Sequence, residues 1–184
     1  LDESVFGTVF HRYSVMYFDT SWTYLVPDER WFPTTSAAVR ITTALVDEQP
    51  SDWLAGVVTT AFTDDVTSVY SSVPQSAGTA QVELSPEVLA LQQLTVDRMA
   101  TQLEASLATA GITEVQLTVD GVPIAATPVQ TRSTAVTGGP LVLTDEGFGF
   151  LSGSELTPIG GLSSAVVRSN PVAVQVGPNQ ESAA

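Results

Sequence analysis

The sequence predicts an α+β fold: a small, mainly antiparallel sheet covered on one face by helices, in the order ββαββαβ, followed by a β-hairpin extension. Three patterns support this class. Apolar and polar residues alternate over Val9–Phe18 and again over Thr79–Leu84, as in strands with one covered face. Over residues 86–110 the apolar residues instead recur every three or four positions, as on a helix. A length of 184 residues with 43% hydrophobic content suffices for one core plus an appendage.

The first expected strand covers Val9–Phe18, because its odd positions share one face of an extended chain. Asp19–Ser21 has the composition of a turn, after which Thr23–Val26 is expected to return antiparallel. Pro27 and Pro33 are then expected to bracket an irregular loop.

A first short helix is expected after residues 34–36, which are Thr, Thr and Ser and all acceptable N-caps. Ala37, Ile41 and Leu45 fall on one face of this helix, which ends before Pro50. Residues 51–54 are expected to add one capped turn. A hairpin should follow, made of strands Val66–Val73 and Thr79–Leu84 around a loop that contains proline and glycine.

The longest expected helix covers residues 86–110. Ser85 serves as its N-cap, Pro86 takes the first helical position and Glu87 lies beside the positive helix end. Gly111 is a natural C-terminal stop. The apolar stripe that should cover the sheet consists of Val88, Leu91, Thr95, Met99, Leu103 and Leu107. The last core strand is expected around Val115, Leu117 and Val119, followed by a turn at Asp120-Gly121 and by Val122–Ile124.

The composition shifts after Ala125 to Thr, Ser, Gly and Pro. We therefore expect one α+β domain over residues 1–130 and a separate segment over residues 131–184. The later segment has three short β-rich runs, at Leu141–Leu143, Phe148–Leu151 and Val172–Val176, and the first two are expected to form a hairpin around Asp145-Glu146-Gly147.

The charge balance limits the possible partners. The sequence has 6 basic residues against 20 acidic ones, a formal net charge of −14, so nucleic acid and anionic membrane surfaces are not expected partners. All six basic residues are arginines, and the absence of lysine and cysteine excludes Schiff-base lysines, P-loop lysines, cysteine nucleophiles and thiolate metal sites. No run of apolar residues is long enough to span a bilayer. We predict no cofactor and no metal.

No catalytic residue is predicted, and the chain is not expected to be an enzyme. The single histidine, His11, shares a strand face with Val9, Tyr13 and Val15, which favours packing. Residues 161–165 resemble a nucleophile elbow only faintly, because no helix with adequate apolar periodicity follows them. The adjacent acidic pairs are best explained by solvated surface; they are Asp28-Glu29, Asp47-Glu48, Asp64-Asp65 and Asp145-Glu146.

Five large aromatic residues in or beside expected loops and turns are the candidate binding residues: Trp22, Tyr24, Trp31, Phe32 and Trp53. Such side chains either fold back onto the core or are offered to a partner. The sequence leaves both roles open, and the five residues form our candidate protein interface.

Two regions carry a resemblance to a known family. The first includes Val15-Met16-Tyr17-Phe18-Asp19, Tyr24–Pro33, the helical region 86–110 and the run Val115–Pro123. This region resembles the GerMN (sporulation and spore germination) domain as it occurs in actinobacterial LpqB-type lipoproteins. The second region, Gly147–Ala165, resembles the segment leading into the C-terminal β-propeller of that family.

The resemblance implies a non-enzymatic, extracytoplasmic accessory module, the lipoprotein partner of a sensor histidine kinase and response regulator that act in cell-wall and division control. It implies an anchor through an acylated cysteine upstream of Leu1, and an incomplete β-propeller over residues 131–184. A fragment that begins after the anchor needs no direct membrane insertion of its own. The alternatives are a cell-wall glycan-binding module or a hydrolase with an unrecognised site.

Overall fold

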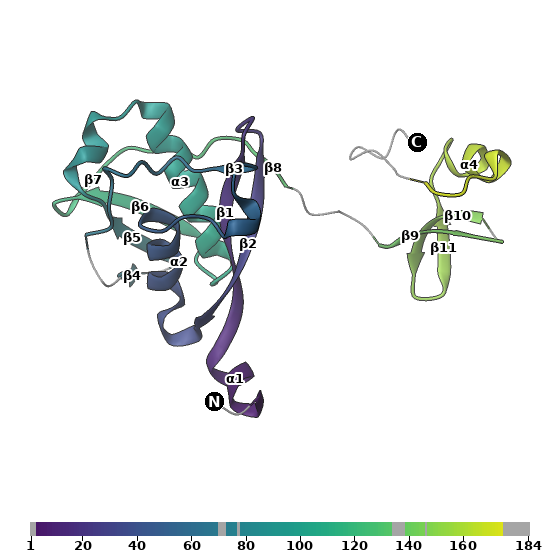
Figure 1. Ribbon diagram of the computed structural model, residues 1–184, viewed down its shortest axis with the longest axis horizontal. Coiled ribbons are helices and arrows are strands. Elements are labelled where there is room, and N and C mark those ends of the chain that lie inside the picture. Colours follow the sequence, from purple (N-terminus) through teal and green to yellow (C-terminus); the bar gives the residue numbers. More distant parts are fainter. Residues whose placement is uncertain (1–2, 70–72, 77, 134–138, 146, 175–184) are drawn as a thin grey trace. The chain divides into compact units, whose positions relative to one another are not determined.

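The computed structural model describes residues 3–69, 73–76, 78–133, 139–145 and 147–174 (Figure 1). The chain forms two compact units, Leu1–Thr134 and Ala135–Ala184. Each unit is described by itself.

The first sheet of the first unit has the strand order β3-β1-β2-β8. Helix α1 (Glu3–Val9) leads directly into strand β1 (Phe10–Asp19), which forms a long antiparallel hairpin with β2 (Tyr24–Pro33). Strand β3 (Val58–Thr59) pairs with the end of β1, and β8 (Arg132–Ser133) pairs in parallel with the start of β2. The hairpin extends from the core towards α1 (Figure 1).

The loop expected between Pro27 and Pro33 does not exist, because β2 runs through both prolines. Met16 lies opposite Pro27, and the backbone N–H and C=O of Met16 bind side chains of a helix instead of β2. Met16 and Pro27 therefore form a non-hydrogen-bonded pair of the antiparallel ladder. At a pair of this kind the backbone N–H and C=O groups of each residue point away from the other strand. Pro33 lies six residues after Pro27, and because backbone orientation in a strand repeats every two residues, the nitrogen atoms of both prolines point away from β1. Neither proline therefore removes a hydrogen bond from the hairpin.

The second sheet has the order β4-β5-β6-β7. Its strands are β4 (Gln75–Ser76), β5 (Thr79–Glu83), β6 (Glu114–Val119) and β7 (Val122–Pro123). The α+β class is confirmed, but the strands are divided between two sheets, and β5 and β6 are parallel. A helical crossover connects β5 to β6, which is the connection that parallel neighbours require.

The first helical region agrees with the sequence prediction. It comprises η1 (Thr34–Ser36), α2 (Ala37–Val46) and the single turn η2 (Asp52–Leu54). Helix α2 packs against β1, β2 and the long helix α3 (Gln93–Ala108), and buries Ile41, Ala44 and Leu45 completely.

The expected helix 86–110 is divided into two. The start signals at Ser85–Glu87 produce the short 3₁₀ helix η3 (Pro86–Ala90), and the extended backbone of Leu91 and Gln92 separates it from α3. The stripe nevertheless faces the core: Val88, Met99, Leu103 and Leu107 are fully buried, while Leu91 and Thr95 are half-buried. Because α3 contacts both β1 and β6, it joins the two sheets into one core.

The expected strand Val66–Val73 is not regular over residues 66–69, and residues 70–72 lie outside the described part. Only Ser68 forms a bridge, with Leu84. The backbone N–H groups of Thr67 and Ser68 bind the side chains of Ser85 and Asp47. These side-chain acceptors supplement the two backbone hydrogen bonds of this bridge, from Val69 N–H to the Glu83 carbonyl and from Ser85 N–H to the Thr67 carbonyl.

The second unit contains a three-stranded antiparallel sheet with the order β11-β10-β9. Strands β9 (Leu141–Thr144) and β10 (Gly147–Ser152) form the expected hairpin, and β11 (Glu155–Pro158) follows. Helix α4 (Ser163–Ser169), a short helix that the sequence analysis did not predict, contacts β10. Residues 172–174 form no strand, and the rest of that expected run lies outside the described residues.

Candidate interaction surface

The turn between β1 and β2 is built around the carboxylate of Asp19. This carboxylate accepts hydrogen bonds from the backbone N–H groups of Ser21, Thr23 and Tyr24, at 3.2, 2.8 and 2.8 Å, and from the Ser21 hydroxyl. These bonds, with the Ser21 hydroxyl first, lower the pKa of Asp19 to about 2. The turn is therefore held by its own polar groups.

Trp22 occupies this turn with a positive φ of 60°. Its ring lies 5.1 Å from that of Phe18, and the guanidinium of Arg98, on α3, lies 4.1 Å from the Trp22 ring centroid. A cation over an aromatic face is attractive. Trp22 is therefore half-buried by contacts within the unit.

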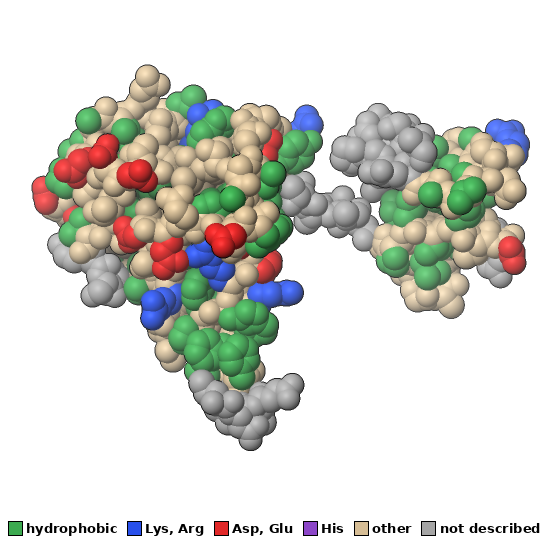
Figure 2. Space-filling view, viewed as in Figure 1, with side chains coloured by type: hydrophobic (Ala, Val, Ile, Leu, Met, Phe, Trp, Pro, Cys, Tyr) green, Lys and Arg blue, Asp and Glu red, His purple; other side chains and the backbone are tan. Residues whose placement is uncertain are grey.

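The opposite end of the hairpin carries an aromatic cluster made of Phe6 from α1, Phe10 from β1 and Trp31 from β2. The Phe6 ring is stacked on Phe10 at 5.0 Å, and Phe6 and Trp31 are 5.2 Å apart. Trp31 is 54% exposed and Phe6 is 36% exposed. Hydrophobic side chains gather at this end of the unit, with Arg side chains on either side (Figure 2).

The five predicted interface residues do not form one surface. Trp31 lies seven positions beyond Tyr24 in β2, which is about 23 Å in an extended strand. Phe32 is half-buried and stacks on Tyr13 at 6.4 Å. Trp53, in η2, is 71% exposed. Trp31 and Trp53 are thus the two of the five that are freely accessible, and the binding role of the set stays a prediction.

Charged side chains lie beside Trp31 on the hairpin. Arg12 is directly opposite Trp31 in the register and is 68% exposed. Its Nε lies 3.4 Å from a carboxylate oxygen of Glu29, which also accepts a 2.7 Å hydrogen bond from the Ser14 hydroxyl. Because the ion pair involves only Nε, the outer nitrogens of the guanidinium remain available.

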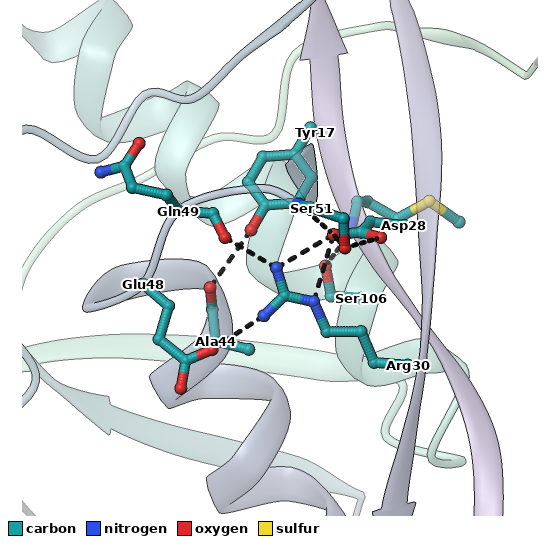
Figure 3. A network of polar contacts seen from close by, with 9 residues as sticks. Tyr17, Asp28, Arg30, Ala44, Glu48, Gln49, Ser51 and Ser106 are labelled. Atoms are coloured by element: carbon teal, nitrogen blue, oxygen red, sulfur yellow. Dashed lines mark hydrogen bonds and ion pairs between the residues drawn. The ribbon is translucent and has the colours of Figure 1, made fainter. Parts of the chain in front are cut away.

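A polar clamp fixes β2 immediately before Trp31 (Figure 3). The carboxylate of Asp28, only 1% exposed, accepts hydrogen bonds from Arg30 at 2.9 and 3.1 Å and from the backbone N–H and hydroxyl of Ser51. Arg30 also contacts Glu48 at 2.8 Å and donates to the carbonyl of Gln49 at 2.7 Å. The segment after α2 is therefore tied to β2.

Tyr17 closes the end of α2 on the same side of the hairpin (Figure 3). Its hydroxyl donates a 3.2 Å hydrogen bond to the carbonyl of Ala44, one of the last carbonyls of α2. Such carbonyls have no partner within their own helix. Burial raises the pKa of Tyr17 to about 12.

The free edge of β1 is occupied in part by α3. The Met16 N–H donates to the Ser106 hydroxyl at 2.8 Å, and the buried Gln102 amide donates to the Met16 carbonyl at 2.9 Å. Gln102 also accepts a 2.7 Å bond from the N–H of Ala61. Two helix side chains therefore replace a neighbouring strand at this point.

Sequence reasoning missed Phe6, Phe10 and Arg12 as members of this surface. The i, i+4 spacing of the two phenylalanines was a signal that one helical turn could bring their rings together. The prediction that Asp28 lies on the solvated surface was also wrong, because its carboxylate is buried in the clamp. His11 was expected to pack with Tyr13 and Val15 but is exposed, since β1 extends beyond the core at this end.

A pocket of about 740 Å³ lies in the second unit, between the sheet and α4; its lining includes Asp145, Phe148, Glu155, Ser163, Ser164 and Arg168. The Ser163 hydroxyl accepts a 2.7 Å hydrogen bond from the backbone N–H of Ile159, which ties it to the loop before α4. Within the residues that the structure describes, no three acidic or histidine side chains converge to hold a metal ion. None of the described helices has the length and apolar character needed to cross a bilayer.

The comparisons with known proteins concern the first unit and the fold. Residues 14–125, more than half of the chain, match the family described as Germane: Sporulation and spore germination. The chain is similar to a solved structure of the tandem GerMN domains of the sporulation protein GerM from Bacillus subtilis, with a TM-score of 0.50 and 17% identity. The match covers 83% of this chain and 51% of that one, so the chain spans about half the length of the GerM structure. No curated protein matches. The chain therefore belongs to the Germane (GerMN) family of sporulation and spore germination domains.

Proposed function

We propose that this chain is a non-enzymatic accessory module that binds a partner protein through the aromatic end of its β1–β2 hairpin. The supporting observation is the cluster of Phe6, Phe10 and Trp31 at the end of the hairpin, in which Phe6 and Trp31 are exposed and Phe10 is half-buried. Exposed groups of large apolar side chains mark interaction sites, and tryptophan and arginine are the residue types most enriched at binding hot spots.

The Asp28–Arg30 clamp supports this role, because it holds β2 in place next to Trp31. A side chain whose backbone is fixed before binding loses less conformational freedom when the partner arrives. The clamp thus pre-organises the surface without contacting the partner.

The partner we propose is the extracytoplasmic domain of a sensor histidine kinase, to which the chain is brought as a lipoprotein anchored upstream. This finer assignment follows the likeness to LpqB-type lipoproteins in residues 15–33 and 147–165. In the same proposal, residues 131–184 begin a β-propeller, and β9, β10 and β11 supply three of the four strands of its first blade.

Binding of the purified kinase domain to Trp31→Ala tests the proposal. Loss of a hot-spot tryptophan costs 2 kcal/mol or more, so the dissociation constant should rise by about 30-fold. Trp53→Ala is the matched control, since it removes the same side chain at an exposed site elsewhere on the unit and should leave affinity within about twofold. Equal binding by wild type and Trp31→Ala would exclude this surface.

Two other outcomes would point to the alternative functions. Retention of the chain on isolated cell wall that is lost in Trp31→Ala or Trp53→Ala would indicate a glycan-binding module, because aromatic faces stack on sugars. Turnover of peptidoglycan fragments that is abolished by an Asp or Ser substitution would indicate a hydrolase.

A further inference from the structure

We propose that the partner adds a β-strand to the open edge of β1 between Phe10 and Ser14, and that this strand carries an acidic side chain two residues from a large apolar one. This inference rests on the proposed function and names the chemistry of the partner segment.

The edge of β1 that faces away from β2 is covered only at one end. Strand β3 pairs with Phe18 and Asp19, and the side chains of α3 bind the main chain of Met16. Arg12 and Ser14 lie four and two residues before Met16, so their backbone N–H and C=O groups point towards the same open edge. Within the described part of the chain, no partner reaches the outward N–H and C=O groups of these two residues. They offer up to about four main-chain hydrogen bonds to an antiparallel strand.

The edge of β2 is different. Strand β8 pairs with Tyr24 and Leu25, and two of the next four outward positions are Pro27 and Pro33. A proline has no N–H to donate, and proline at an edge position hinders the addition of another strand. Of the two edges of this hairpin, the edge of β1 is therefore the one that can accept a partner.

The side chains beside the open edge select the partner sequence. Arg12 projects from the same strand face as Phe10, and its outer guanidinium nitrogens can bind a carboxylate in a bidentate manner. The rings of Phe6 and Phe10 favour an apolar neighbour. Because a strand repeats every two residues, the acidic and the apolar side chain are two positions apart.

A second copy of this chain fits the edge poorly. Antiparallel pairing of two β1 edges about Arg12 would place two arginines opposite each other, and like charges at such a pair are destabilising. The observations therefore favour a different protein.

The test uses the full chain labelled with ¹⁵N and two synthetic peptides of about ten residues. In both peptides polar and apolar residues alternate; the polar positions are Glu in one peptide and Lys in the other. The Glu peptide should shift the amide signals of Arg12 and Ser14, slow their hydrogen exchange, and bind about tenfold more tightly than the Lys peptide. Ser14→Pro should weaken this binding about tenfold.

The matched control is Glu29→Pro. Ser14 and Glu29 are cross-strand partners, so both variants lose the same side-chain hydrogen bond. Glu29→Pro removes an N–H from the opposite edge and also releases Arg12 from its ion pair, so it should bind the Glu peptide at least as tightly as wild type. If either proline variant unfolds, Arg12→Glu tests the proposal instead. This variant should bind the Lys peptide more tightly than the Glu peptide, which is the reverse of wild type. Equal affinity of wild type for the two peptides, signal changes at the β2 edge, or shifts that depend on protein concentration without peptide would overturn the proposal.

Failure of this inference is distinguishable from failure of the proposed function. Kinase-domain binding that requires Trp31 but is unaffected by Ser14→Pro would overturn strand addition and leave the binding surface standing. Kinase-domain binding that is independent of Trp31 would reject the surface itself.

Discussion

Tyr17 links the hairpin to the C-terminal end of α2, and its environment predicts a pH effect. The unfolded chain loses the phenolic proton near pH 10, whereas burial holds the folded pKa at about 12. Between these values the folded state binds more protons than the unfolded state, so stability falls as pH rises from 10 to 12. Tyr17→Phe should cost about 1 kcal/mol at neutral pH through loss of the bond to Ala44, and should remove this slope. Denaturant unfolding at several pH values measures both effects; parallel curves for the two proteins would contradict them.

Asp28 and its neighbour Glu29 offer a matched comparison of a buried and an exposed carboxylate. Asp28→Ala removes the acceptor for Arg30 and Ser51 and leaves a largely buried guanidinium, which should cost about 3 kcal/mol of unfolding free energy. Glu29→Ala removes an exposed pair with Arg12 and should cost less than about 1 kcal/mol. Similar losses in the two variants, measured by urea unfolding, would mean that the clamp does not stabilise the hairpin.

At the scale of single elements, α3 is the main core contact. Leu103 is completely buried between the sheets, so Leu103→Ala should lower the free energy of unfolding by about 2–5 kcal/mol. Leu94, on the same helix, is 50% exposed, and Leu94→Ala should change stability by less than about 0.5 kcal/mol. Thermal and denaturant unfolding of both variants provide the check, and a small effect at Leu103 would mean that this face is not the buried one.

Periodicity predicted the elements whose patterns are long. Strand β1, helix α2 and strands β5 and β6 follow their alternating or helical patterns closely. The sequence analysis ended the second strand before Pro27, whereas β2 continues to Pro33. The direction in which a proline nitrogen points depends on the register with β1, which the sequence alone does not reveal. The break before α3 likewise lies in the backbone of Leu91 and Gln92, where no glycine or proline marks it.

The exposure of the five candidate aromatic side chains could be predicted only in part, because it depends on contacts between residues that are far apart in the sequence. Trp31 and Trp53 are accessible as a binding role requires, whereas Trp22 is held by Arg98, a residue far away in the sequence. The participation of Phe6 depends on the helix α1 running directly into β1 without a loop. Two-residue strands such as β3 and β8 carry too little pattern to be recognised.

At the scale of the whole molecule, charge is distributed unevenly along the chain. In Figure 2 acidic side chains spread over the core, and arginines lie both beside the aromatic end and elsewhere on the two units. With a net charge of −14, binding to DNA or to anionic vesicles should be negligible at physiological salt. Co-sedimentation and gel-shift measurements check this expectation, and salt-sensitive retention by either ligand would contradict it.

The dependence of the first unit on the second is also testable. We predict that removal of the second unit lowers the melting temperature of the first unit. The cut belongs after Thr134, because the N–H groups of Val129 and Arg132 bind Thr101 and Thr23 of the first unit. Truncation at Gln130 would delete β8 and destabilise the unit for that reason alone. An unchanged melting temperature after the cut at Thr134 would identify residues 135–184 as an independent appendage.

The even spacing of Pro27 and Pro33 has a consequence for sequence variation. An insertion or deletion of one residue between them would turn one proline nitrogen towards β1, where it would remove a ladder hydrogen bond and press its ring against the neighbouring strand. Such a change between Asp28 and Trp31 would also place these two side chains on the same face of the strand. Homologous chains that keep both prolines in a strand without a β-bulge should therefore differ in length here only by even numbers of residues.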